Sequence, residues 1–398
     1  MDAQYDIVVS GGGPAGLTAA AAFGAAGFRV ICLDPAPPVT ERDADGSDLR
    51  TTALLQPARN LLERCGLWPR LAPHATPLQT MRIIDAGGDT PQPRVTRDFV
   101  ASDISDQPFG WNLPNWLLRR ELAAQLAELP TVEFRPGTGT RSLFTRTGEA
   151  RVGLSDGSRL RARLVVAADG RDSPMRTAAG IGVRRMTYGQ KALAFAVTHS
   201  VPHDNVSTEI HRSGGPFTLV PLPDYQGRPS SAVVWLDHGR KVLERAQLDA
   251  PAFEAEMTER SCGVLGPLAL ASRRTVWPII SQHAEQMAGE RLALMAEAAH
   301  VMPPIGAQGL NMSLADLAGL LDLAEAAPQD LGDAGMLERY HRKRMRDVRM
   351  RVTGIDALNR ASIAGAQPLR DLRAMGLGAL HALPPVRQGL MRMGLGLT

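Results

Sequence analysis

Several features that would assign a protein class at once are missing from this chain of 398 residues. Its three cysteines, Cys32, Cys65 and Cys262, are too few and too scattered for a disulfide framework or a metal site. No apolar run reaches the roughly 18 residues that indicate a membrane span, and no secretory signal precedes the first apolar segment. With 44 Lys and Arg against 41 Asp and Glu, the charge of +3 argues against nucleic acid as a partner. We therefore expect a protein of a reducing compartment, the cytoplasm.

Histidines are also too dispersed to form a metal site. Those of the central region show no metal-ligand spacing, and hydrogen-bonded or solvated roles fit them better: His199, His203, His211, His238 and His283. We expect no metal. Hydrophobic residues make up 44% of the chain, which is enough for full cores in two or three domains.

The clearest positive signal is a strand–turn–helix–strand unit at the start of the chain. Tyr5–Ser10 is a β-branched apolar strand, Leu17–Gly27 an Ala-rich helix, and Phe28–Leu33 a second strand that ends at Asp34. Between the first strand and the helix lies the turn Gly11-Gly12-Gly13-Pro14-Ala15-Gly16. A GxGxxG pattern alone is weak evidence, but here it has the element order of a dinucleotide-binding unit.

The glycines of this turn and the acid after the second strand each have a physical purpose. Gly11 permits the tight turn, Gly13 permits close approach of a pyrophosphate, and Gly16 lets the helix pack on the strand. Asp34 lies where a carboxylate would bind ribose hydroxyls, and it would repel a 2′-phosphate. The sequence therefore favours FAD or NAD as the ligand.

A second candidate site lies between Leu292 and Leu321. An apolar strand leads through a Pro- and Gly-rich bend into a helical pattern that resumes at Leu310. The free N–H groups and positive dipole of a helix start suit a partly negative ligand atom near Gly306–Asn311. Glu297, just after the strand, is placed to accept hydrogen bonds from ligand hydroxyls. An ordinary strand–loop–helix corner remains the alternative.

Three further segments allow two readings each. The strand Leu160–Gly170 ends in Asp169-Gly170, which is either a ligand-binding sheet edge or a plain turn. Leu49–Cys65 has a helical pattern carrying Arg50, which either reaches a cofactor or is a solvated charge. Asn115–Leu126 is an apolar helix whose Arg119 and Arg120 fit a solvated face, Arg120 above all.

The region Lys191–Trp277 changes to short β-like runs between Pro, Gly and Asp clusters, which predicts a mostly antiparallel sheet that acts as a lid. Beyond Leu337 a helix is strongly basic, and from Ala374 to Thr398 the chain alternates Leu, Met and Gly. These segments are either solvated helices or a surface that rests on an anionic membrane. Pro384-Pro385 should divide the tail into two helices.

The three cofactor-type segments, in this order, resemble the class A flavoprotein monooxygenases. EAAHVMPPIGAQGLN is very similar to that family's Asp-Ala-Ala-His…Pro-Pro…Gly…Gly-Leu-Asn motif. Within the family, the chain looks most like the ubiquinone-biosynthesis ring hydroxylases, through RTTALL, PNWLLRREL, GGPFTLVPLP and LRAMGLGALHALPPVRQGLMRMGLGL. Two positions depart from the pattern: Ala296-Glu297 replaces Gly-Asp, and Ala315-Asp316 replaces Arg-Asp.

This resemblance implies an α/β fold like that of para-hydroxybenzoate hydroxylase. A Rossmann-like FAD-binding domain with a parallel sheet would carry an inserted, mostly antiparallel β-sheet substrate domain and a C-terminal helical segment. The expected limits are 1–80, 101–180 and 278–336 for the FAD-binding domain, 81–100 and 181–277 for the substrate domain, and 337–398 for the helical region.

Site residues follow from the same resemblance. It implies that the FAD pyrophosphate is bound by the turn of Gly11, Gly13, Pro14, Ala15 and Gly16, and the ribose by Asp34. It implies that Asp169 and Gly170 contact the flavin and the nicotinamide, and that Glu297 contacts the ribityl chain. The pyrimidine edge of the flavin would be bound by Gly306, Gln308, Gly309, Leu310 and Asn311, and its polar side by Arg50, Asn115 and Arg119. Pro303 and His300 adjoin the flavin in the family motif. They are the only catalytic candidates, because no acid or base can be named.

The implied function is FAD-dependent hydroxylation of the ring of a polyprenylated phenol in ubiquinone biosynthesis, through a flavin C4a-hydroperoxide made from O2. Because a second GxGxxG is absent, electrons would come from transiently bound NAD(P)H or from a protein donor. Other ubiquinone-biosynthesis proteins and the inner face of the membrane would be partners. A prenyl reductase, another aromatic hydroxylase or a non-catalytic subunit of a biosynthetic complex would keep the same fold. A halogenase is disfavoured because Trp-x-Trp-x-Ile-Pro is missing.

Overall fold

A computed structural model describes residues 3–88, 90–363 and 367–397, so Thr398, the end of the expected helical region, lies outside the described residues. The first layer is an eight-stranded sheet with the order β18-β19-β11-β1-β2-β8, extended by an antiparallel hairpin. Its strands are β1 (Ala3–Ser10), β2 (Val30–Asp34), β8 (Val132–Pro136), β9 (Thr140–Arg146), β10 (Glu149–Leu154), β11 (Arg159–Ala167), β18 (Ala288–Gly289) and β19 (Leu292–Leu294). Four neighbouring pairs run parallel: β1–β2, β1–β11, β2–β8 and β11–β19.

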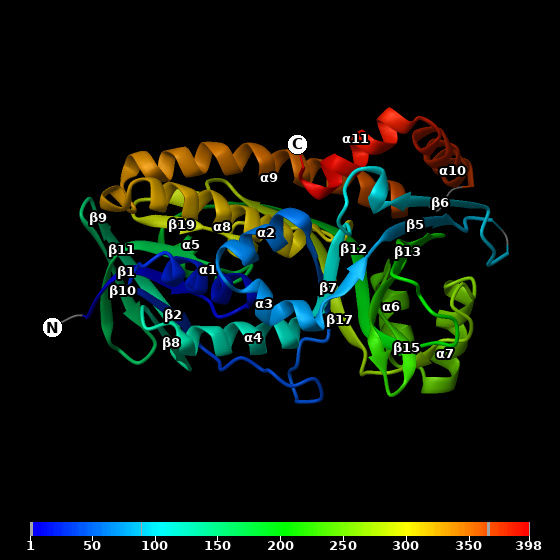
Figure 1. Ribbon diagram of the computed structural model, residues 1–398, viewed down its shortest axis with the longest axis horizontal. Helices are drawn as coiled ribbons and strands as arrows, with labels where there is room; N and C mark the ends of the chain where they lie inside the picture. The colour runs from blue at the N-terminus through cyan, green and yellow to red at the C-terminus, as the bar shows by residue number, and fades with distance from the viewer. Residues whose placement is uncertain (1–2, 89, 364–366, 398) are drawn as a thin grey trace.

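Helices cover this parallel sheet (Figure 1). The helix α1 (Pro14–Ala25) is buried on all sides from Ala15 to Gly24 and contacts both α4 (Asn115–Glu128) and α8 (Gln308–Ala326). Its alanines and glycines allow this crowding because they bring little side-chain volume. The carboxyl ends of β1, β2, β11 and β19 consequently meet at one edge, where open α/β sheets bind ligands.

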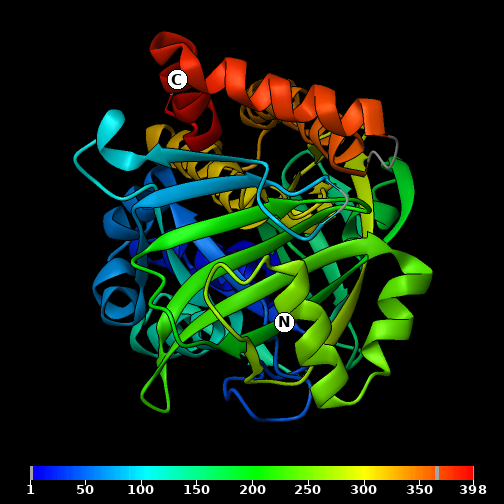
Figure 2. The ribbon, with the colours of Figure 1, turned by 90° about the vertical axis from the view of Figure 1, so that its right-hand side faces the viewer.

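A second sheet of nine strands has the order β20-β17-β12-β15-β14-β13-β5-β6. Its strands are β5 (Thr80–Asp85), β6 (Val95–Val100), β12 (Val183–Thr198), β13 (Val206–His211), β14 (Pro216–Tyr225), β15 (Arg228–His238), β16 (Ala269–Leu270), β17 (Thr275–Ala284) and β20 (His300–Val301). All neighbours are antiparallel except β13 and β5. Figure 2 shows α6 (Gly239–Ala246) and α7 (Ala250–Arg260) in front of this sheet.

One helical expectation was wrong. Within Leu49–Cys65 the residues Thr51–Leu55 form a strand, β3, which pairs with β7 (Gly110–Pro114), and β7 also pairs with β4 (Thr76–Leu78). The helix α2 starts only at Gln56 and ends at Arg64. The β-branched pair Thr51-Thr52 fits a strand, and Pro57 fits the first turn of a helix.

The C-terminal part is helical. α9 (Ala334–Ile363) runs along α8, and α10 (Gln367–Ala382) and α11 (Pro384–Leu395) follow it, with Pro384 at the start of α11 (Figure 1). In the described part of the chain, no helix combines the length and apolar character needed to cross a membrane. The short elements are α3 (Trp68–Leu71), α5 (Pro174–Ala178) and the 3-10 turns η1 (Ala72–His74), η2 (Ala101–Asp103), η3 (Ala296–Ala298) and η4 (Pro328–Asp330).

Candidate functional site

The glycine turn is tightly packed on one side and open on the other. A Cβ on Gly11, whose φ is +110°, would lie 2.3 Å from the carbonyl oxygen of Ala168. A Cβ on Gly16 would lie 1.9 Å from the carbonyl oxygen of Gly11. Gly13 meets nothing within 4 Å, and no side chain caps the N-terminus of α1 that follows it. Open space and free N–H groups therefore coincide at the position expected for a pyrophosphate.

Asp34 at the end of β2 is held beside this turn. Its carboxylate accepts hydrogen bonds from the backbone N–H of Gly12 (2.6 Å) and of Ala36 (2.9 Å). A Cβ on Gly12 would lie 2.8 Å from the Asp34 Cβ, so only glycine fits there. The backbone thus fixes the carboxylate between the turn and solvent, where ribose hydroxyls can reach it.

Asp169 lies at the carboxyl end of β11, next to the turn. One carboxylate oxygen accepts hydrogen bonds from Ser10 Oγ (3.2 Å) and from the N–H of Met175 (3.1 Å). The other, Oδ1, is buried without a partner among the described residues. Burial raises the pKa of Asp169, although hydrogen bonds from the Ser173 side chain and from the N–H of Met175 oppose the rise. Gly170, with φ +87°, turns the chain away. A buried acceptor of this kind suits a ligand hydroxyl or amide.

A third cluster is organised by Asp48, which the sequence analysis did not identify. The buried Asp48 carboxylate accepts hydrogen bonds from Arg50 Nε (2.8 Å), Arg50 Nη2 (2.7 Å) and Asn115 Nδ2 (3.0 Å). Burial would raise the pKa of Asp48, but the hydrogen bonds and charge of Arg50 outweigh it and hold the pKa below its usual value. The only sequence signal was an acid two residues before Arg50.

The same cluster leaves donors unused. The Arg50 guanidinium lies 4.0 Å from the centre of the Trp277 ring. This cation–π contact joins the loop that precedes β3 to β17. Arg119 Nε on α4 is buried and has no partner in the described residues, although the residue as a whole is half-buried. Arg120, by contrast, is exposed and pairs with Glu121.

Glu297 is carried by η3, directly after β19. Its carboxylate lies 3.4 Å from Arg171 Nε and is half-exposed, so it can also accept hydrogen bonds from a ligand. Ala296 before it has a φ of +56°, in the left-handed region that favours glycine. The family's Gly-Asp at this position therefore has a conformational reason, and the alanine here bears strain.

The start of α8 is built from two left-handed residues, Gly306 (φ +64°) and Ala307 (φ +57°). Asn311 fixes this turn to β3: its Nδ2 donates to the carbonyls of Ala53 (2.7 Å) and Ala307 (2.6 Å), and its Oδ1 accepts from the N–H of Leu55 (2.8 Å). No side chain caps the helix.

The flanks of this turn differ in exposure. Gly309 faces open space, with nothing within 4 Å of a built Cβ. Leu310 is half-buried, and Pro303 is buried. Gln308 Nε2 donates to the carbonyls of Gly306 (2.8 Å) and of Gly394 on α11 (3.0 Å). The exposed backbone of the turn is therefore rigidly held, as an anion-binding helix start requires.

His300 belongs to a buried charged group rather than to an open site. Its Nε2 lies 2.6 Å from Asp316 Oδ2, and Arg344 Nε donates to Asp316 Oδ1 at 2.8 Å. Burial would raise the pKa of Asp316, but the charges of His300 and Arg344 keep it low. In the sequence, Asp316 stands out only as part of a departure from the family pattern. Nothing there marks Arg344, which lies 28 residues later on α9.

FAD suits this arrangement. Free N–H groups at two helix starts suit the pyrophosphate and the flavin's negatively charged edge. The unpartnered Asp169 Oδ1 and Arg119 Nε supply a buried acceptor and donor. In the described ranges, no three His, Cys, Asp or Glu side chains gather as a metal site would need.

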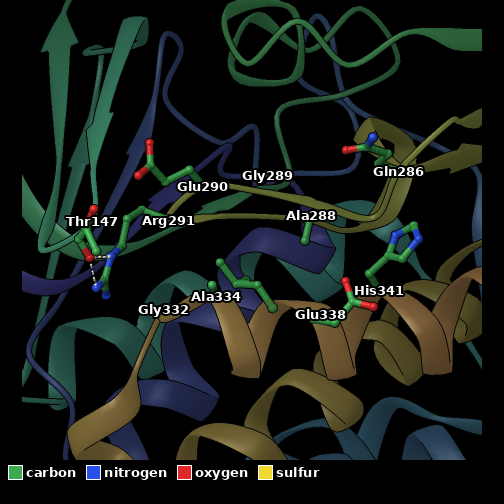
Figure 3. Close-up of a pocket in the computed structure, with 11 residues that line it drawn as sticks. Thr147, Gln286, Ala288, Gly289, Glu290, Arg291, Gly332, Ala334, Glu338 and His341 are labelled. Atoms are coloured by element: carbon green, nitrogen blue, oxygen red, sulfur yellow. Dashed lines mark hydrogen bonds between the residues drawn. The ribbon is translucent and has the colours of Figure 1, made fainter.

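A separate pocket of about 420 Å³ lies away from these groups (Figure 3). Arg291, Glu338 and His341 line it, between the β18–β19 turn and the start of α9. None of the residues predicted to bind the cofactor lines this pocket. We therefore do not assign the ligand to it.

Comparisons with known proteins identify the family of the chain. Residues 4–354 match the family model described as FAD binding domain. The chain is 32% identical to ubiquinone hydroxylase UbiL from Rhodospirillum rubrum over 400 residues, which cover 99% of this chain and 90% of the relative. It is 26% identical to 3-demethoxyubiquinol 3-hydroxylase from Escherichia coli, covering 98% of each.

Solved structures show the same fold. The crystal structure of p-nitrophenol 4-monooxygenase PnpA from Pseudomonas putida superposes with a TM-score of 0.79 at 19% identity, covering 99% of each chain. The fold is therefore the Rossmann-like FAD-binding domain with an inserted β-sheet domain that the resemblance implied. The chain belongs to the FAD-binding family of the class A flavoprotein monooxygenases.

Proposed function

We propose that this FAD-dependent monooxygenase hydroxylates the aromatic ring of a polyprenylated phenol in ubiquinone biosynthesis. The observation that carries the proposal is the match, along 99% of this chain, to a relative named ubiquinone hydroxylase. The polar groups that fit FAD support it, because such chemistry needs a flavin. O2 is the oxygen source, and NAD(P)H bound transiently or a protein donor supplies electrons.

FAD, when bound and reduced, supplies the two electrons that activate dioxygen. The backbone of Gly11–Gly16 holds the pyrophosphate, Asp34 the ribose, and Asp169 and Glu297 the hydroxyls and amide edge. Arg50, Asn115 and Arg119 would contact the polar side of the flavin. The start of α8 stabilises negative charge there through its dipole and free N–H groups. The predicted domain limits and the positions of Gly170, Pro303 and Gln308–Asn311 beside the flavin are part of this proposal.

We propose further that α9–α11 rest on the cytoplasmic face of a membrane, where a polyprenylated substrate dissolves. Large apolar side chains are exposed on these helices and on residues next to α11: Met350, Leu358, Met375, Leu380, Leu383, Val386, Leu390, Met393 and Leu397. Arg342, Lys343, Arg346 and Arg349 are exposed on α9. Apolar and basic groups together favour anionic lipid. Contact with other ubiquinone-biosynthesis proteins is a further expectation.

Aerobic turnover tests this function. The purified protein with FAD, NADH or NADPH and short-chain prenylated phenols should consume O2 and give a product heavier by one oxygen atom. A product that gains hydrogen without O2 consumption would indicate a reductase instead. Flavin binding without conversion of any phenol would contradict the proposal and favour a non-catalytic role.

A further inference from the structure

The two faces of the nine-stranded sheet have different surroundings. Residues that alternate along its strands form a core with α6 and with Phe253 of α7. Among them are Leu193, Phe195, Ile210, Phe217, Leu219 and Trp235. Side chains of a strand alternate between faces, so the residues between these point the other way. On that other face, Gln190 bonds Asn359 of α9 and Trp277 stacks on Arg50. The second face therefore looks toward the FAD-binding domain (Figure 1).

This second face is mostly apolar, and on β12 it carries small residues. Every second position there is alanine: Ala192, Ala194 and Ala196, which pair with Leu236, Val234 and Ala232 of β15. Because these alanines are short, β12 fills less of the space in front of this face than larger side chains would. An aromatic substrate that enters this space needs a polar partner for its hydroxyl.

Glu209 and His211 on β13 provide a polar partner for such a hydroxyl. Ile210 between them belongs to the core with α6 and α7, so both side chains lie on the second face. His211 Nε2 is 2.7 Å from Glu209 Oε1, with the two side chains 14% and 10% exposed. His211 Nδ1 is buried and lacks a partner within the described ranges. The pair is thus shielded from bulk water but holds one unused polar atom.

Hydrogen bonds from α7 hold the β13–β14 hairpin that carries this pair. Arg260 on α7 donates from Nη2 to the carbonyls of Ile210 (3.1 Å) and Gly215 (2.8 Å). Gly214 and Gly215 allow the close turn, because a Cβ there would lie 2.1 Å from Asp237 Oδ1 and 2.7 Å from Leu236 Cβ. A pair with such support has a fixed position, which acid–base chemistry needs.

The surrounding charges are already paired. On β5, Asp85 lies opposite His211 in register and is bonded by Arg94 Nη2 at 2.7 Å. Arg212, the next residue, points to Glu259 on α7. Thr218, opposite Glu209 on β14, is an uncharged neighbour on the same face. Within this part of the sheet the Glu209–His211 pair is consequently the group suited to accept a proton from a substrate.

We propose that Glu209 and His211 bind the substrate's phenolic hydroxyl and take its proton, an assignment that rests on the proposed function. The phenol O–H bond breaks, a new N–H bond forms at His211 Nδ1, and Glu209 stabilises the imidazolium across the 2.7 Å contact. The resulting phenolate is more electron-rich, which favours oxygen transfer to its ring. Once the hydroxylated ring carbon has lost its proton, the proton on His211 returns to the phenolate oxygen.

The test compares H211N and E209Q with wild type in the FAD-loaded protein. Binding of a short-chain phenol is followed by ultraviolet difference absorption, in which phenolate absorbs at longer wavelength than phenol. Wild type should give the phenolate signal, whereas H211N should bind the phenol without it. The value of kcat for hydroxylation should fall about 100-fold or more in H211N and less in E209Q, with KM changing little.

H238N is the matched control, because His238 is exposed at the end of β15. It should behave as wild type. Unchanged FAD affinity and far-ultraviolet circular dichroism establish that each variant is folded, and E209Q keeps the volume of the pair. If wild type hydroxylates phenols and both variants do so equally well with the phenolate signal intact, the assignment is overturned. If wild type converts no phenol, the proposed function itself fails.

Discussion

At the residue scale, His300, Asp316 and Arg344 form a buried charged group beneath the segment that carries Glu297. Asp316 also accepts the backbone N–H of Ala296 at 3.3 Å. Resemblance alone placed His300 beside the flavin, but no local sequence pattern reveals that Arg344, from a different helix, shares its partner. Pairing between residues on different helices depends on how the chain folds, and the spacing of residues along the sequence does not reveal it.

Replacing Asp316 by Asn should lower the free energy of unfolding by about 3–5 kcal/mol, because it removes the fully buried charge that pairs with His300 and Arg344 and leaves Arg344 only the partly exposed Asp347. Chemical denaturation measures the change. D322N on the exposed side of the same helix should change it by less than about 1 kcal/mol, since Asp322 only pairs with Arg64 at the surface. Equal effects of the two substitutions would show that the buried group is not structural.

The contribution of Asp316 should depend on pH in a defined direction. Its pKa is lower in the folded state than the unfolded value of about 3.9. The stabilisation is therefore fully present above the unfolded pKa and is lost as pH falls through the folded pKa. The stability difference between wild type and D316N should shrink below about pH 4. A difference that grows in acid would contradict this assignment.

Ala296 is the second informative residue. Because its φ of +56° is strained for a residue with a Cβ, A296G should raise the free energy of unfolding by about 0.5–1 kcal/mol, after the entropy of glycine is counted. The midpoint of urea unfolding reports it. A315G, within α8, should instead lose about 1 kcal/mol. Loss of stability in A296G would mean that the left-handed conformation is not strained here.

At the element scale, the sequence predicts the start of α8 but not the strand that holds it in place. The bend and helix from Gly306 to Asn311 are predictable, because Gly, Pro and the apolar period mark them. The contact that fixes this helix start to β3 could not be predicted, because Thr51–Leu55 was expected to be helical. Strand formation there depends on pairing with β7, more than fifty residues away, and local periodicity cannot report that.

Gln308 links this helix start to the C-terminal helices. Its side chain contacts Gly306, Gly394 and, through Oε1, Arg351 Nη1 at 2.9 Å. Q308A should weaken FAD binding about fivefold to tenfold, because the backbone that we propose to face the flavin loses its support. Fluorescence titration with FAD measures this, and R342A, which removes an exposed charge of α9, should leave the affinity unchanged. An unaltered Kd in Q308A would exclude this positioning effect.

At the scale of the whole molecule, the FAD-binding domain, the inserted sheet and the helical tail follow from ordered motifs, and family resemblance predicted all three. The direction in which the substrate sheet faces could not be read from sequence. It depends on which residues of β12–β15 pack on α6 and α7, and both faces of those strands are rich in apolar residues.

The membrane proposal concerns this scale as well. L383S combined with M393S should reduce partitioning onto anionic vesicles about tenfold, because both side chains are 56% exposed and would enter the lipid. Vesicle sedimentation gives the bound fraction. The control is L243S on α6, an equally apolar change at a residue 49% exposed on another face. Undiminished binding of the double variant would contradict a lipid-facing tail.

The most direct test of the account is the visible absorption spectrum of the purified protein before and after FAD is added and excess flavin removed. The free helix starts and the unpartnered Asp169 and Arg119 atoms predict one tightly held flavin per chain. A D169A–R119A double variant should hold it more weakly. Protein that stays colourless and retains no FAD under any condition would contradict the central claim, because every proposed step depends on that cofactor.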